Sequence, residues 1–195
     1  MKKLIRILVL GLLFISAPSK ADDISDFQIE GMSIGDSALD FYSITFIKSA
    51  KKYNCENGVY KSCRFFTALM GSKGIYTGDI QLNFKKNDPD YEIYAIGGTV
   101  GYRNNIKECY TKKKEISFEL EEFFPNAKRR EYESAHEADK TGKSRVEQTI
   151  FDFTDGSNAK VACFDWTKKM GYEDHLRISI SSKKYIDWLN NEAYN

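Results

Sequence analysis

Residues Val146 to Ser181 read VEQTIFDFTDGSNAKVACFDWTKKMGYEDHLRISIS, and this stretch decides the fold. Apolar and polar residues alternate in three runs, Val146 to Phe153, Lys160 to Trp166 and His175 to Ser181, which predicts three strands. Thr154-Asp155-Gly156-Ser157 has the residues of a tight turn between the first two strands. Strands grouped by short turns build an antiparallel sheet.

The remaining chain adds strands and helices around these three runs. Alternation predicts further strands, and apolar residues at helical spacing predict amphipathic helices that cover an apolar sheet face. We expect an α+β fold with two layers, a mostly antiparallel sheet with amphipathic helices packed on one face. The predicted strands are 26–30, 75–84 and 91–99, the helices are 37–50, 105–124 and 182–192, residues 65–66 are irregular, and 126–144 form a solvated loop or an edge hairpin.

The first 21 residues have the three regions of a secretory signal peptide. Lys2, Lys3 and Arg6 form a positive start, an apolar run of nine residues follows, and Ser19-Lys20-Ala21 offers a cleavage site. Nine apolar residues are short against the roughly 20 that cross a bilayer, so we expect no stable membrane anchor. The sequence therefore predicts export, either to the periplasm or out of the cell.

The composition after residue 21 is that of one folded α+β domain, residues 22–195. This part carries 25 Lys and Arg against 28 Asp and Glu, a net charge of −3. A small acidic excess gives no electrostatic reason for binding nucleic acid. Length and aromatic content are sufficient for one buried core.

The four cysteines, Cys55, Cys63, Cys109 and Cys163, are even in number and lie in the exported part, which predicts disulfides. Three pairings are possible. Asn57-Gly58 turns the chain between Cys55 and Cys63 and favours that pair, which leaves Cys109 to Cys163. A zinc site is the alternative, but the spacing contains no CxxC pair.

No motif has the spacing that a specific chemistry requires. Gly142-Lys143-Ser144 ends like a phosphate-binding loop, but Glu137 stands where that motif has a glycine. His136-Glu137 begins like a zincin helix, but Lys140 stands where the second histidine belongs. We therefore predict no catalytic residue, no metal site and no cofactor.

A binding surface is the function that we favour from the sequence. His175, Arg177 and Ser179 alternate with apolar residues, which places them together on one face of a strand. The predicted partner is an envelope protein, a peptide or a small ligand. The alternative is a small exported hydrolase or metal-dependent enzyme that uses His136, Asp139 and His175, and it requires these side chains to converge in one site.

Three segments carry a resemblance to other proteins. Residues 29–41 (IEGMSIGDSALDF), 136–144 (HEADKTGKS) and 163–166 (CFDW) resemble small exported proteins of marine and other Gram-negative bacteria that have no assigned function. Gly31-Met32-Ser33 is similar to the turn before the first helix in small envelope domains related to the outer-membrane assembly lipoprotein and to β-lactamase-inhibitor modules. The second resemblance implies an interaction module.

Overall fold

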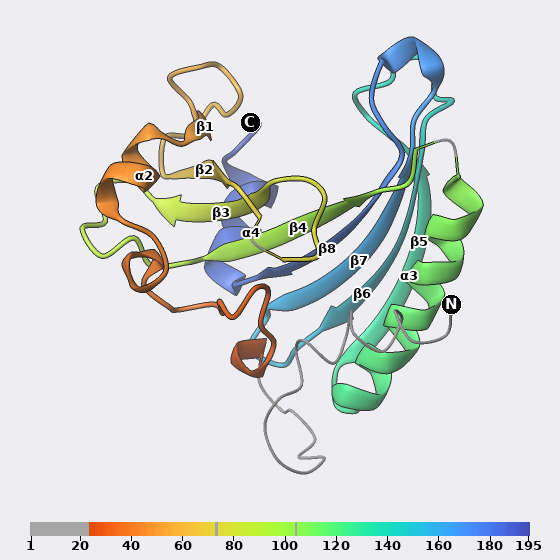
Figure 1. Ribbon diagram of the computed structural model, residues 1–195, viewed down its shortest axis with the longest axis horizontal. Coiled ribbons are helices and arrows are strands. Elements are labelled where there is room, and N and C mark those ends of the chain that lie inside the picture. Colours follow the sequence, from red (N-terminus) through yellow and green to blue (C-terminus); the bar gives the residue numbers. More distant parts are fainter. Residues whose placement is uncertain (1–23, 73, 104) are drawn as a thin grey trace.

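A computed structural model describes residues 24–72, 74–103 and 105–195, and its centre is one eight-stranded antiparallel sheet (Figure 1). The predicted signal peptide lies outside the described residues. The strand order is β1-β2-β3-β4-β8-β7-β6-β5. The strands are β1 (Lys51–Tyr53), β2 (Phe65–Met70), β3 (Ile80–Lys85), β4 (Ala95–Gly101), β5 (Lys128–Ala135), β6 (Arg145–Asp152), β7 (Asn158–Asp165) and β8 (His175–Ser181).

Two longer helices accompany the sheet, α3 (Ile106–Phe123) and α4 (Lys183–Asn191), and both were predicted. The Asn105 side chain accepts a hydrogen bond from the Glu108 amide at the start of α3, and Ser182 caps α4 through the Tyr185 amide. Such caps satisfy amide groups that have no partner inside the helix. The chain therefore has the predicted α+β class.

The three strands that decide the fold form as predicted. β7 lies between β6 and β8, and each of these pairs is antiparallel. Alternate residues point to opposite faces, so one face of the sheet is almost entirely apolar. That face builds the main core, whose central members are Leu82, Ile96, Val161, Ile178 and Ile180.

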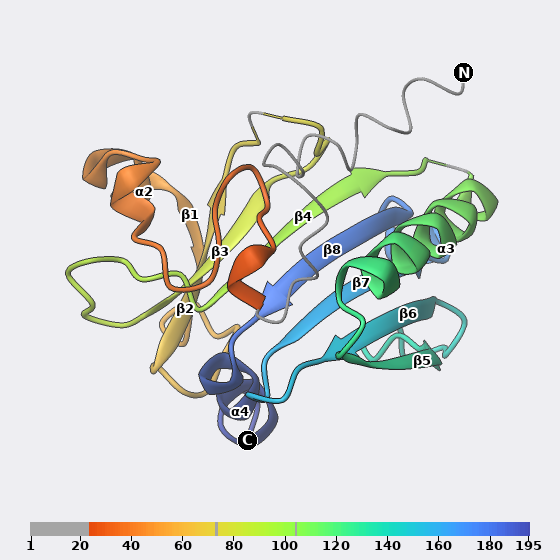
Figure 2. The ribbon, with the colours of Figure 1, turned by 90° about the horizontal axis from the view of Figure 1, so that it is seen from below.

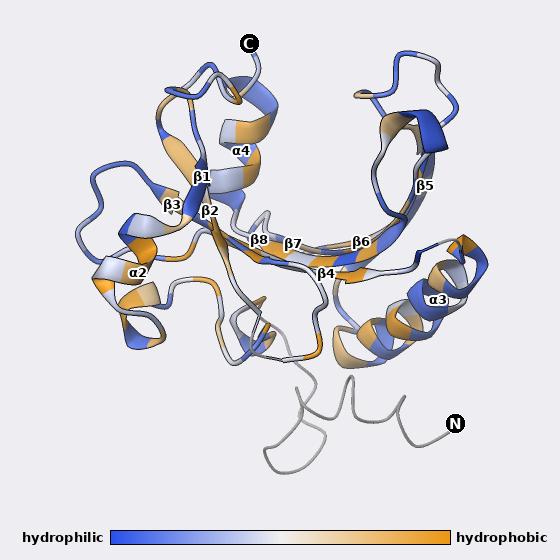
Figure 3. Cartoon of the chain, turned by 45° about the horizontal axis from the view of Figure 1, so that its top comes forward, coloured by the Kyte–Doolittle hydropathy of each residue, from blue (hydrophilic) through white to orange (hydrophobic). Residues whose placement is uncertain are grey.

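The structure corrects the expectation that all helices pack on one face. α3 lies on the main core, but α4 lies on the opposite face (Figure 3). Trp188 of α4 is completely buried against Phe65, with ring centres 5.2 Å apart, and against Tyr60 at 4.9 Å. Phe65 points away from the main core, and a large aromatic residue there needs its own cover.

The first half of the chain also differs from the sequence prediction. Residues 26–30 form no strand: Asp26 ends a 3₁₀ turn, Ile24–Asp26, and Ile29 makes an isolated bridge with Met32. The predicted helix over 37–50 divides into a 3₁₀ turn at Ala38–Asp40 and α2 (Ile44–Ser49). Residues 65–66 open strand β2, where irregular structure was predicted. Of the two possibilities for 126–144, the edge hairpin is observed, because β5 pairs with β6 along its full length.

Lys113 interrupts the apolar face of α3, and the structure explains it. Its side chain is buried, and its ammonium group lies 2.8 Å from a Glu147 carboxylate oxygen on β6. A buried cation needs such a partner. The ion pair therefore joins α3 to the sheet.

Both disulfides of the favoured pairing are present, Cys55–Cys63 and Cys109–Cys163. The second spans 54 residues and joins α3 to β7, with the two Cα atoms 6.0 Å apart. A zinc site is excluded for these cysteines, because none of them is free. The Cys109–Cys163 disulfide and the Lys113–Glu147 ion pair both attach α3 to the face of the sheet that carries the main core.

Candidate functional site

Figure 3 shows no helix over strands β5 to β7 on the face of the sheet opposite α3, and we call this face, over β5 to β8, the open face. α4 and its aromatic neighbours cover this side only at the end that contains β2 and β4. Figure 3 shows the sheet curving toward the side of α4, so that β5 and α4 rise at opposite ends of the open face. Figure 2, from another direction, shows α3 lying across β6 to β8 on the other side.

The predicted binding residues His175, Arg177 and Ser179 all lie on the open face, because β8 buries the residues between them in the main core. His175 and Arg177 are partly exposed, and Ser179 is buried at the base. Register pairs Ser179 with Lys160 of β7 and with Gly97 of β4. Lys160 therefore joins the predicted set, although the sequence interpretation did not include it.

Lys160 and Arg177 form a pair of cations without acidic partners, and we call them the cation pair. They are diagonal neighbours on β7 and β8, an arrangement that places residues about 7 to 8 Å apart. Within the described residues, no carboxylate oxygen lies within 4.0 Å of either side-chain nitrogen. Burial, and then the charge of Arg177, lower the pKa of Lys160 to about 8, and burial also lowers the pKa of Arg177.

The space that Arg177 occupies depends on a glycine in the next strand. A methyl group at Gly97 would lie 3.2 Å from Nε of Arg177 and 3.0 Å from Cβ of Ser179. This separation is too short for a comfortable contact, so a side chain at position 97 would push Arg177 away. The glycine thus allows the guanidinium group to lie low over β4.

Tyrosines from the α4 side border Arg177. After burial, the phenol groups of Tyr185, Tyr60 and Tyr194 act on the pKa of Arg177, and all three raise it. The Tyr185 hydroxyl donates to Oδ1 of Asn83 at 2.8 Å, and that of Tyr60 lies 2.9 Å from Thr67 Oγ1. These contacts fix the tyrosines as one wall of the open face.

Aromatic rings form the other wall. The rings of His175 and Phe164 stack with centres 4.6 Å apart and an angle of 11°. His136 lies 4.2 Å from Trp166, which in turn lies 4.7 Å from Tyr172. The rings contact one another, and they form a partly exposed aromatic cluster next to Arg177 on the open face.

The alternative catalytic set is only partly brought together. His136 and His175 both contact Phe164, with ring-centre distances of 5.8 Å and 4.6 Å, so the two imidazoles are at most 10.4 Å apart. Phe164 is the ring that both contact. Burial lowers the pKa of each histidine, which favours the neutral form.

Asp139 has a structural role in the β5–β6 loop. Its carboxylate accepts hydrogen bonds from the Thr141 amide at 2.9 Å, the Ser144 amide at 3.0 Å and three hydroxyls, including that of Thr167 at 3.2 Å. These bonds hold the pKa of Asp139 well below its usual range. A carboxylate with its oxygens so engaged is a poor general base.

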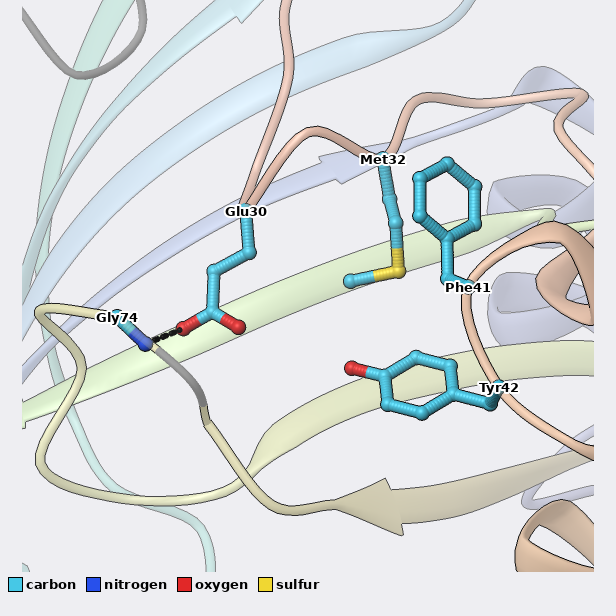
Figure 4. Close-up of a pocket in the computed structure, with 5 residues that line it drawn as sticks. All are labelled: Glu30, Met32, Phe41, Tyr42 and Gly74. Carbon is cyan, nitrogen blue, oxygen red and sulfur yellow. Dashed lines mark hydrogen bonds between the residues drawn. The ribbon is translucent and has the colours of Figure 1, made fainter.

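A separate hollow of about 310 Å³ lies on the N-terminal side of the sheet (Figure 4). Its lining includes Glu30, Phe41 and Tyr42. The Glu30 carboxylate accepts hydrogen bonds from the Gly74 amide at 2.9 Å and from Ser72 Oγ at 2.5 Å. The carboxylate thus holds the loop before β3, and we assign it this structural role.

Among the described residues, no group of three His, Cys, Asp or Glu side chains is arranged to hold a metal ion. In the same part of the chain, no helix is long and apolar enough to cross a membrane. Comparison with protein-family models, curated proteins and solved structures found no match. The open face is therefore interpreted from its own geometry.

Proposed function

We propose that this chain is an exported, non-enzymatic binding domain whose open face, around His175, Arg177 and Ser179, holds an envelope protein, a peptide or a small ligand. The observation that carries the proposal is the cation pair, Lys160 and Arg177, which has no carboxylate partner in the described structure. Charges removed from water without a partner lower stability. Proteins retain such costs mainly at functional sites.

The surroundings support a binding surface. The cation pair lies between two aromatic walls, on a face that α4 covers only at one end. The paired strands fix the backbone of these residues, so binding requires no rearrangement of the backbone at the site. The two disulfides support an oxidising compartment, which is consistent with the periplasm or the extracellular space.

The hydrolase alternative has weaker support. The carboxylate of Asp139 already accepts hydrogen bonds from its own loop. This leaves only His136 and His175 of the proposed catalytic set, and both rings pack against Phe164. A general base must reach a reacting atom directly or through one water. A binding role uses the residues of the open face as they stand.

The test is capture of a partner by the protein with both disulfides formed. The immobilised protein is incubated with a native envelope extract, and bound proteins and small molecules are identified by mass spectrometry. Arg177→Glu removes the central cation, and Lys107→Glu makes the same charge change on α3, where the lysine is exposed. We expect a ligand that is retained by wild type and Lys107→Glu and lost by Arg177→Glu. No ligand, or equal retention by all three, would count against the open face as a binding site.

A further inference from the structure

The open face holds two positive charges close together, and their number indicates the charge of the ligand that fits. Lys160 and Arg177 are diagonal neighbours, and both side chains are long enough to reach one group between them. Two basic residues of the edge strand β5 are neutralised, because Arg129 pairs with Glu121 and Glu131, and Arg130 pairs with Asp152. Lys51, Lys85 and Lys128 are strand lysines that also form no ion pair within the described part of the chain, but they are exposed, whereas both members of the cation pair are partly buried.

We propose that the cation pair binds a doubly charged anionic group of the phosphate-monoester type, carried by a soluble ligand. This inference rests on the proposed binding function of the open face and names its ligand class. A dianion matches the two cations, whereas a single carboxylate leaves one positive charge without a partner. Guanidinium and ammonium groups both donate charge-assisted hydrogen bonds to phosphate oxygens.

The neighbours of the cation pair fit this ligand class. Ser179 faces Lys160 in register, and its hydroxyl is a further donor at the base of the site. Phe164 and His175 on one side and Tyr185 on the other reduce contact with water, which strengthens electrostatic attraction. Residues 22–195 have a net charge of −3, so the overall charge of this part does not attract an anion and the local charge of the cation pair must do so.

The charged and titratable groups that act on the cation pair come from several elements. Arg177 on β8 acts on Lys160, and no acid does so. Tyr185 of α4, Tyr60 and Tyr194 act on Arg177. A bound dianion thus becomes the first acidic partner of both cations.

The experiment is a titration with glycerol 3-phosphate at about pH 7.5, where a phosphate monoester carries nearly two charges. Calorimetry measures affinity, and amide NMR shifts locate the site. We expect saturable binding with shifts on β7 and β8. Lys160→Met and Arg177→Met should each weaken binding at least about tenfold, the loss expected for one charge-assisted contact. Lys107→Met, the matched control on α3, should bind like wild type.

Two further arms separate ligand classes and sources. Acetate, with one charge, should bind at least about tenfold more weakly. Phosphatidic acid vesicles present the same phosphate chemistry on a membrane and should bind no better than the soluble ester. Preference for vesicles or acetate, or absence of saturable binding, would overturn the proposal. If Arg177→Glu still abolishes capture from the extract in that case, the ligand class is wrong and the binding face is retained.

Discussion

Replacing Lys160 with methionine should stabilise the unliganded protein at neutral pH. The folded chain lowers the pKa of Lys160 from 10.5 to about 8, first through burial and then through Arg177. A tenfold change in proton affinity corresponds to about 1.4 kcal/mol, so the full penalty is about 3 kcal/mol. Lys160 is partly exposed, and screening by water reduces the expected gain to about 1 to 2 kcal/mol.

The sign of the pH dependence follows from the lowered pKa. Between about pH 8 and 10.5 the unfolded chain binds the Lys160 proton and the folded chain does not, so wild-type stability from this group rises with pH. Below about pH 8 the penalty is fully present. The advantage of Lys160→Met over wild type should therefore be largest at pH 7 and shrink toward pH 10.

Denaturant unfolding followed by tryptophan fluorescence measures this difference. Trp166 and Trp188 are the two reporters. Wild type, Lys160→Met and Lys107→Met are compared at about pH 7 and pH 9.5, and Lys107→Met should remain within about 0.5 kcal/mol of wild type. A Lys160→Met protein less stable than wild type at pH 7, or an advantage that does not change with pH, would refute the reasoning.

Three further predictions concern the fold. Glu147→Gln leaves Lys113 buried without a charge partner and should cost about 3 kcal/mol in chemical denaturation, more than Lys113→Met; the reverse order would contradict a buried ion pair. Trp188→Ala opens a cavity under α4 and should cost about 3 to 5 kcal/mol; a thermal midpoint equal to wild type would show that α4 does not depend on this ring. Loss of Cys109–Cys163 through paired alanine substitutions should cost about 4 kcal/mol in the same unfolding assay, and intact mass with and without reductant should show two disulfides. Four free thiols after oxidising purification would be incompatible with that assignment.

The sequence predicted well those elements that have a clear period. The strands within residues 146–181 alternate, and α3 and α4 have caps and apolar faces, so local chemistry was sufficient. The placement of α4 was wrong, because the side of the sheet that it covers depends on which face Phe65 occupies. Residues 65–66 were predicted as irregular, so Phe65 was not assigned to a strand. The sequence therefore could not show that its ring lies on the opposite face and needs α4 as a cover.

The candidate site was predicted in part. Alternation along β8 was enough to place His175, Arg177 and Ser179 together. Lys160 was missed because its position beside Ser179 depends on register, although a lysine in an otherwise apolar strand was a usable signal. The full role of Asp139 could not be recognised, because its bond to Thr167 joins segments that are separate in sequence, whereas its bonds to Thr141 and Ser144 lie within one loop.

The most direct measurement is the pKa of the Lys160 amine, followed by NMR of labelled lysine with and without glycerol 3-phosphate. An amine beside Arg177 without an acid should titrate near 8. A bound dianion favours the protonated form, so saturation with the ester should raise this pKa by more than about one unit. A pKa that does not change on addition of the ester would contradict anion binding by the cation pair. An ordinary lysine pKa without the ester would contradict the absence of an acidic partner.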